Sequence, residues 1–248
     1  MGPIGVVERL APYLPTNPVI PTGGDKPIHA ISGAPWGSAL ILLISYGFIR
    51  LLGPQGLRKS TEAAILNANY IRARLEKDFD ILYTGESGTV AHEMIIDCRP
   101  FKNETGVSVE DIAKRLMDYG YHAPTVSFPV AGTMMIEPTE SESKEELDRF
   151  VEVMRAIREE IRQIESGMMS KEDNPLVHAP HTLESIMGDW PHNYMKEQAI
   201  FPLAFIREQK YWPPVSRIDS AYGDRHLICT CPPMEHYDSD FAEPLVMS

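Results

Sequence analysis

The sequence predicts a small α/β domain in which helices cover one face of a short sheet, with extended segments at both ends of the chain. Three observations support this fold class. Two amphipathic patterns begin at serine caps, several short apolar runs are bounded by turns, and both ends lack sustained periodicity. With 248 residues, 43% of them hydrophobic, the chain is long enough to bury a core.

The N-terminal part is predicted to be extended before it becomes helical. Residues 1–35 are rich in proline and include the turn Thr22–Asp25, which favours loop structure. The apolar segment Ser38–Leu52 predicts a helix that is buried on all sides. After the break at Gly53–Gly56, a second, amphipathic helix is predicted over Leu57–Lys77, with apolar residues beside charged ones.

Two further helices are predicted from caps and spacing. The first begins after Ser108, which has a carboxylate three residues on, and ends at Gly120 in the left-handed conformation. The second begins at a capping box of Ser143 and Glu146 and keeps helical apolar spacing until Gly167. The short apolar runs between the helices predict the strands Asp80–Thr84, Glu93–Asp97 and Gly132–Ile136.

The chain divides into three segments on this pattern. Residues 1–56 form loop and apolar helix, residues 57–170 form the small α/β domain, and residues 171–248 form a C-terminal tail. The tail has many prolines, aromatic residues and histidines but little periodicity. We expect it to wrap over a larger body and to need that body for its shape.

Composition excludes several classes of partner. The 23 basic and 35 acidic residues give a net charge of −12 without a basic stripe, which argues against nucleic acid. The longest apolar run, Ala39–Ile49, is well short of the roughly 18 residues that suggest a membrane span. Three cysteines cannot build a disulfide framework, and the first residues lack the pattern of a secretory signal, so a reducing compartment is expected.

The cysteines and one histidine pair were considered as metal ligands. Cys229 and Cys231 are close enough to bind zinc or act as a redox pair, but Cys98 is the only other cysteine, and structural zinc sites usually have two close pairs. His178 and His181 enclose a proline, which prevents the helical presentation of a zinc-protease motif. We therefore expect no metal site, and a metal or thiol-redox module remains a minor alternative.

Loops offer better candidates for ligand binding. The small residues of Ser32–Ser38 precede a helix, so their backbone N–H groups could hold a phosphate, although a simple cap by Ser38 explains the pattern equally well. His122 follows a helix end and feeds a strand, a common place for a functional side chain, but a structural role fits as well. Arg99 could bind a carboxylate, or pair with Asp97.

Eight segments, in the same order along the chain, carry a resemblance to one enzyme family: Met1–Val6, Ser32–Ser38, Thr61–Tyr70, His92–Glu93, Asp118–Thr125, Pro129–Thr133, Glu137–Ser141 and Arg217–Glu235. Together they closely resemble the C-terminal part of glycine dehydrogenase (decarboxylating), the P-protein of the glycine cleavage system. The resemblance covers essentially the full chain.

The resemblance implies a fold-type I pyridoxal-phosphate enzyme that decarboxylates glycine and passes the aminomethyl group to the lipoyl arm of the H-protein. In the family the Schiff-base lysine lies in an Asn-Leu-His-Lys-Thr type segment followed by a glycine-rich run. The chain has lysines in other contexts only: Lys26, Lys59, Lys77, Lys102, Lys114, Lys144, Lys171, Lys196 and Lys210. We expect no covalent cofactor on this chain and no activity of the chain alone.

The resemblance also suggests site residues and partners. Residues expected near the cofactor phosphate, in the same or a neighbouring subunit, are Ser32, Gly33, Gly37 and Ser38. Those expected to line the glycine and lipoyl path are His122, Thr133 and Arg217. Residues 1–56 would pack on the missing cofactor domain, and residues 171–248 would cover the active-site region.

The expected partners are the lipoyl-bearing H-protein, the cofactor-bearing part of the P-protein, and further copies of the same chain. The expected compartment is the bacterial cytoplasm or the mitochondrial matrix. An alternative of a different class is a non-catalytic module that binds the lipoyl carrier or a partner subunit.

Overall fold

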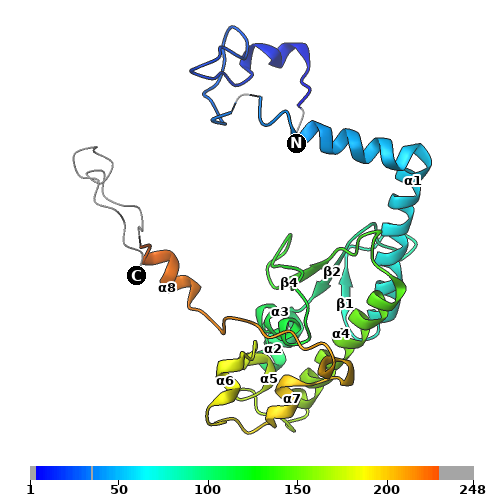
Figure 1. Ribbon diagram of the computed structural model, residues 1–248, viewed down its shortest axis with the longest axis vertical. Helices are drawn as coiled ribbons and strands as arrows, with labels where there is room; N and C mark the ends of the chain where they lie inside the picture. Colours follow the sequence, from blue (N-terminus) through cyan, green and yellow to red (C-terminus); the bar gives the residue numbers. More distant parts are fainter. Residues whose placement is uncertain (1–3, 35, 229–248) are drawn as a thin grey trace.

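A four-stranded antiparallel sheet in the order β1-β2-β4-β3 organises the fold (Figure 1). The computed structural model describes residues 4–34 and 36–228. The strands are β1 (Asp80–Leu82), β2 (Met94–Asp97), β3 (Thr125–Val126) and β4 (Thr133–Ile136). The three predicted strands are confirmed with shorter bounds, and β3 is an addition that the sequence reasoning missed.

The sheet turns one face to the helices. In the register of β2 with β4, Met94 pairs with Ile136 and Ile96 with Met134, so these four side chains share a face. All four are buried in the main hydrophobic core together with residues of the helices. The alternate residues, including Met135, point to the opposite face. The predicted class, a mixed α/β fold with helices on one face of a short sheet, is confirmed.

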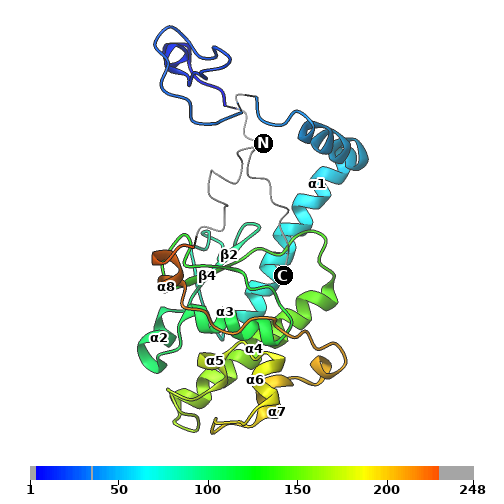
Figure 2. The same cartoon turned by 60° about the vertical axis from the view of Figure 1, so that its left-hand side comes forward.

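Helices of very different length surround this sheet (Figures 1 and 2). The longer ones are α1 (Ile41–Leu75), α2 (Arg99–Thr105), α3 (Val109–Asp118) and α4 (Lys144–Glu165). The shorter ones are α5 (Pro175–His178), α6 (Leu183–Met187), α7 (Lys196–Ile200) and α8 (Ser220–Arg225), with 3-10 turns η1 (Glu8–Tyr13) and η2 (Ala204–Arg207). The sequence reasoning predicted α1, α3 and α4, but not α2, the four shorter helices or the two 3-10 turns.

The caps of α3 and α4 explain why these helices begin where they do. At α3, the Ser108 hydroxyl accepts from the Asp111 N–H at 3.2 Å, and the Asp111 carboxylate accepts from the Ser108 N–H at 2.7 Å. At α4, the Ser143 hydroxyl accepts from the Glu146 N–H at 3.2 Å. The Glu146 carboxylate binds Arg149 instead of returning to the cap, so the predicted box is half formed there.

Helix α1 consists of two halves that meet at Gly53. This glycine has φ 62° and ψ 178°, a conformation that only glycine adopts readily, and Pro54 follows it. After the break, Ala68, Ile71 and Leu75 are buried in the core, and this half packs on α4.

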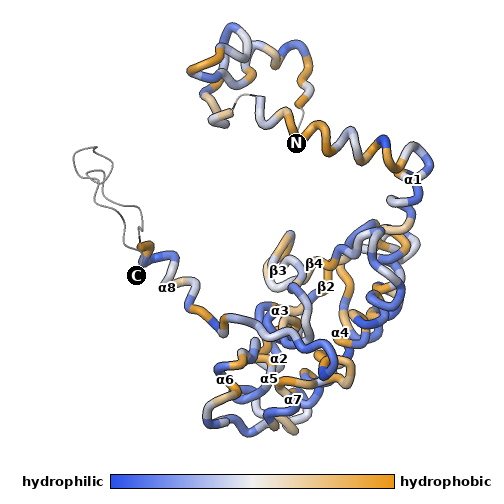
Figure 3. The backbone as a smooth tube through the Cα atoms, in the orientation of Figure 1, coloured by the Kyte–Doolittle hydropathy of each residue, from blue (hydrophilic) through white to orange (hydrophobic). Residues whose placement is uncertain are grey.

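The half before the break corrects the prediction of a helix buried on all sides. Nine of its apolar or aromatic residues are exposed: Ile41, Leu42, Leu43, Ile44, Tyr46, Phe48, Ile49, Leu51 and Leu52. Figure 3 shows this segment as a largely hydrophobic tube that projects away from the sheet. An exposed apolar surface of this kind usually packs against another surface, and no described element of this chain packs against it.

The C-terminal segment contains short helices that its weak periodicity did not indicate. Residues 171–212 form short helices and turns that pack directly on α3 and α4, with Leu176, Ala199 and Ile200 buried. Their shape is therefore supported by contacts within this chain. Within residues 4–34 and 36–228, none of the helices combines the length and apolarity needed to cross a bilayer.

Candidate functional site

The segment Tyr121–Pro124 lies between two neighbouring hollows of the small domain. It lines both, one of about 660 Å³ and the other of about 490 Å³. Both fall within the range of roughly 300–1,000 Å³ typical of small-molecule sites. His122 contributes to both walls and is exposed, so the structure places this predicted residue at a ligand-accessible position.

The end of α3 determines the place of His122. Gly120 has φ 83°, and the Tyr121 N–H donates to the Leu116 carbonyl at 3.0 Å, which closes the helix and turns the chain out of it. The Tyr121 ring then packs edge-on against Phe150 with the ring centroids 5.3 Å apart. Burial raises the pKa of the Tyr121 phenol, so it stays protonated. The backbone that carries His122 is therefore fixed on both sides.

The two hollows differ in charge. The smaller one includes the carboxylates of Glu137, Glu142 and Glu146 in its lining. Hydrogen bonding from Arg149 lowers the pKa of Glu146, which keeps that group ionised. The hollow is thus suited to a protonated amine. The larger hollow has one acidic and one basic side chain in its wall, those of Glu110 and Lys114.

Thr133 lies on the sheet face away from the core helices. It is fully buried, pairs with Asp97 across the sheet, and its hydroxyl donates to the Val130 carbonyl at 2.6 Å. Its side chain therefore shapes the turn before β4. Beside it, Arg99 binds Asp97 through two nitrogens at 2.8 and 2.6 Å, and this bonding lowers the pKa of Asp97. The simpler interpretation of Arg99, pairing with Asp97, is confirmed.

Arg217 ties the C-terminal segment to the domain. Its guanidinium donates to the carbonyls of Ala179 at 2.7 Å and Leu176 at 2.9 Å, and pairs with the Asp111 carboxylate at 2.7 Å. The guanidinium is thus committed to contacts at the start of α3 and the end of α5. In this chain Arg217 lies at neither hollow.

Ser32 and Ser38 belong to the blue N-terminal segment, which lies far from the sheet in both Figure 1 and Figure 2. Helix α1 begins at Ile41 and its N-cap is Leu40, so the cap by Ser38 is wrong, and the loop does not lead directly into the helix. The Ser32 hydroxyl bonds locally to Ala34. At Gly33 no atom lies within 4 Å of where a Cβ would stand, so a phosphate could approach this backbone closely.

A buried ionic network joins the domain to the C-terminal segment, and the sequence reasoning did not find it. Arg115 is fully buried and donates to both oxygens of Glu160 (3.0 and 2.6 Å), to Asp118 (2.9 Å), and to the carbonyls of Gln198 and Ala199. The only sequence signal was a charged residue on the apolar face of α3, between Ile112 and Leu116.

Asp118 extends this network to His181. The Asp118 carboxylate accepts from the backbone N–H of His181 at 2.7 Å and contacts its ring Nδ1 at 2.7 Å, while the Nε2 meets the Tyr194 hydroxyl at 2.9 Å. Burial opposes ionisation of Asp118, but the bonds from His181 and the charge of Arg115 outweigh it and lower its pKa. The network is a structural link between segments.

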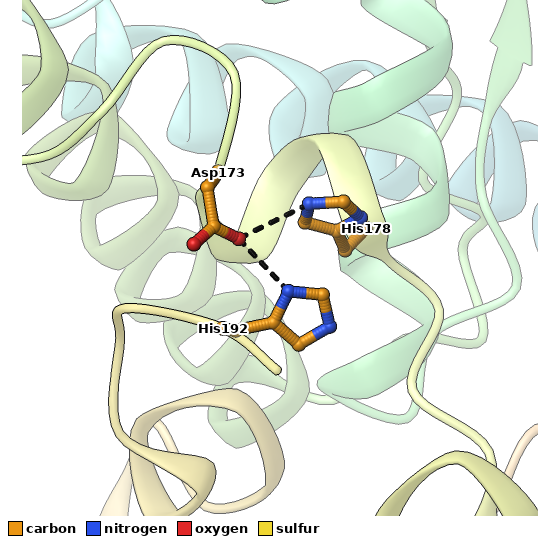
Figure 4. Close-up of side chains that lie close together, drawn as sticks. All are labelled: Asp173, His178 and His192. Atoms are coloured by element: carbon orange, nitrogen blue, oxygen red, sulfur yellow. Dashed lines mark hydrogen bonds and ion pairs between the residues drawn. The ribbon is translucent and has the colours of Figure 1, made fainter. Parts of the chain in front are cut away.

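A second group of side chains lies close by, at the beginning and end of α5. Asp173, His178 and His192 converge so that one carboxylate oxygen meets a nitrogen of each imidazole (Figure 4). The sequence reasoning considered His178 together with His181, but the structure directs these two histidines to different carboxylates. His192 lies 14 residues along the chain from His178, and no local pattern pointed to it.

The cysteines add little chemistry to the described part. Cys98 is buried, and burial raises its pKa to about 12, so its thiolate is not accessible at neutral pH. Cys229 and Cys231 lie outside the described residues.

Comparison with known proteins finds one family model and several relatives that match this chain. Residues 60–181 match the family model of the glycine dehydrogenase C-terminal domain. Residues 60–181 belong to the family of the glycine dehydrogenase C-terminal domain. That match covers α1 from Ser60 onward, the whole sheet, α2 to α5 and the segment of His122. The resemblance inferred from the sequence is therefore confirmed.

Two relatives extend the match to nearly the full chain. The glycine dehydrogenase (decarboxylating) of Christiangramia forsetii is 59% identical over 238 residues, and that of Photorhabdus laumondii is 57% identical over 237 residues. Each alignment covers 96% of this chain. The chain spans 25% of the length of each of these relatives, so it corresponds to one portion of a glycine dehydrogenase.

Proposed function

We propose that this chain is the C-terminal portion of a pyridoxal-phosphate-dependent glycine decarboxylase that transfers the aminomethyl group of glycine to the lipoyl arm of the H-protein and releases CO₂. The identity of 59% over 96% of the chain with a glycine dehydrogenase (decarboxylating) carries the proposal. When bound, pyridoxal phosphate supplies the electron sink for this decarboxylation. The Schiff-base lysine is expected in a segment of the complete enzyme outside these 248 residues.

In this proposal residues 1–56 are the docking segment toward the cofactor-bearing part. The exposed apolar half of α1 supports this role, because contiguous apolar surface usually marks an interface. The loop of Ser32, Gly33, Gly37 and Ser38 would hold the cofactor phosphate through backbone N–H groups. The φ of 63° at Gly37 explains why glycine is needed at that position.

The small domain, residues 57–170, would provide the substrate path. His122 stands between the two hollows, and the acidic wall of the smaller hollow suits an amine such as that of glycine or the aminomethyl group. Thr133 and Arg217 would act as positioning residues. Thr133 holds the turn at Val130, and Arg217 ties its own stretch of chain to the end of α5 through the Ala179 carbonyl.

Reconstitution with a polypeptide that carries the missing upstream part tests the proposal. We expect no exchange of labelled CO₂ into glycine from the chain alone, and exchange in the presence of lipoylated H-protein once the upstream part is added. Borohydride should trap the cofactor on a lysine of the added part. Trapping on a lysine of this chain would contradict the proposal.

Matched variants separate the site from the fold. His122→Ala should lower the exchange rate of the reconstituted enzyme at least tenfold with an unchanged urea midpoint, whereas Lys102→Ala, at an exposed position of α2, should change neither. If the chain captures lipoylated H-protein but never supports exchange with the upstream part, it is a carrier-binding module instead.

A further inference from the structure

We propose that Asp173, His178 and His192 form a binding site for a divalent transition-metal ion, with zinc as its best occupant. Asp173 Oδ1 lies 3.2 Å from His178 Nε2 and 2.8 Å from His192 Nδ1, so three potential ligand atoms surround one point (Figure 4). Two imidazole nitrogens with one carboxylate oxygen is a donor set that favours zinc over magnesium or calcium.

The spacing is close to that of a loaded site. Ligands about 2.0–2.2 Å from a tetrahedral zinc ion are roughly 3.3 Å from one another. The His178 contact already meets this value, and the His192 contact must open by about half an ångström, a rotation that a histidine in a loop can provide. At present His192 is hydrogen-bonded to this oxygen and His178 makes an ion-pair contact with it, and one ion would replace both contacts.

Surrounding groups hold the ligands in this orientation. The second oxygen of Asp173 accepts from the backbone N–H of Asn193 at 2.7 Å, which fixes the carboxylate. Tyr194 stacks on His192 with the centroids 5.0 Å apart, and Trp190 meets the same ring edge-on at 4.8 Å. Such outer contacts orient metal ligands and raise affinity.

Solvent access to the three side chains also favours binding of an ion. The side chains are 20% exposed for Asp173 and His192 and 38% for His178, so an ion and one water ligand could enter from solvent.

A bound ion would stabilise the C-terminal segment. Asp173 precedes α5, His178 ends it, and His192 belongs to the loop before α7, so one ion would close a loop next to Tyr194 and the buried network. This role is structural and is independent of the proposed catalysis.

Titration of the untagged 248-residue chain with zinc, with the heat of binding measured by calorimetry, tests the proposal. Co²⁺ gives a second readout, because tetrahedral coordination produces a strong visible absorption. We expect one ion per chain and a rise in the unfolding temperature. His178→Ala and His192→Ala should each weaken zinc binding at least tenfold. Asp173→Asn, which keeps most of the hydrogen bonds, should weaken it as well.

A second cluster of one histidine and two carboxylates provides the matched control. His92 lies 3.7 Å from Glu93 and 3.6 Å from Glu137, with more than half of its side chain exposed. His92→Ala should leave binding unchanged. The proposal is overturned if zinc does not bind, or if binding survives in His178→Ala and His192→Ala proteins whose metal-free circular dichroism matches the parent chain.

Discussion

Replacing Arg115 by Met should destabilise the chain strongly, because it removes the centre of the buried network. Arg115 makes hydrogen bonds to Glu160, Asp118 and two backbone carbonyls, and its side chain is fully buried. Methionine has a similar length, so little volume is lost. What remains is two buried carboxylates without their cation.

The expected loss follows from that imbalance. Removing one partner of a buried ion pair typically costs about 3–5 kcal/mol, against a total stability of about 5–15 kcal/mol for a domain. With a urea dependence of about 2–3 kcal/mol per molar, the midpoint of unfolding should fall by about 1–2 M. The freed carbonyls of Gln198 and Ala199 should also make residues 196–212 more sensitive to limited proteolysis.

Urea unfolding followed by far-UV circular dichroism measures this loss. The matched control is Arg58→Met. The Arg58 side chain is 81% exposed and pairs with Glu62 alone among the residues that the structure describes, so the effect should stay within about 0.5 kcal/mol. Adding Glu160→Gln to Arg115→Met should recover part of the stability, because it removes one uncompensated charge. A loss for Arg115→Met no larger than that of the control would refute the reasoning.

Three further predictions concern separate features. The lowered pKa of Asp118 contributes stability above the usual Asp pKa of about 3.9 that is lost as pH falls toward the folded-state pKa, so acid titration by circular dichroism should show a shallower loss for Asp118→Asn. Gly120→Ala, at φ 83°, should cost about 1–2 kcal/mol in urea unfolding, whereas Gly47→Ala in the exposed helix should be neutral or stabilising. Leu43→Glu with Ile44→Glu should reduce self-association in sedimentation experiments, since it adds charge to the exposed apolar half of α1; unchanged sedimentation of an associating parent would count against this surface.

The elements with local signals were predictable from the sequence. The cap of Ser108, the left-handed Gly120 and the cap of Ser143 each act within a few residues, and the structure has all three. The apolar spacing of α4 likewise fixed its buried face. In contrast, β3 has two residues and exists because it pairs with β4, and that pairing has no local sequence signature.

The candidate site was predictable only in part, for the same reason. His122 was found because a helix end precedes it. The Arg115 network joins residues about 45 and 84 positions apart in sequence, and the cluster of Asp173 and His192 depends on how a loop folds back. Neither the network nor the cluster can be predicted from composition or from the spacing of residues. His178 and His181 are three residues apart but contact different carboxylates, because proximity in sequence does not set the direction of side chains.

The break at Gly53 gives the exposed half of α1 a definite direction. The half after the break is anchored in the core by Ala68, Ile71 and Leu75, so the half before it projects from the domain as an arm. Because φ 62° with ψ 178° is open only to glycine, the sequence itself encodes this projection. The loop Ser32–Ser38 precedes this arm. In the proposed complete enzyme, burial of the arm against the cofactor-bearing part would therefore also position the loop, so that one docking event provides both the missing cover and the phosphate contact.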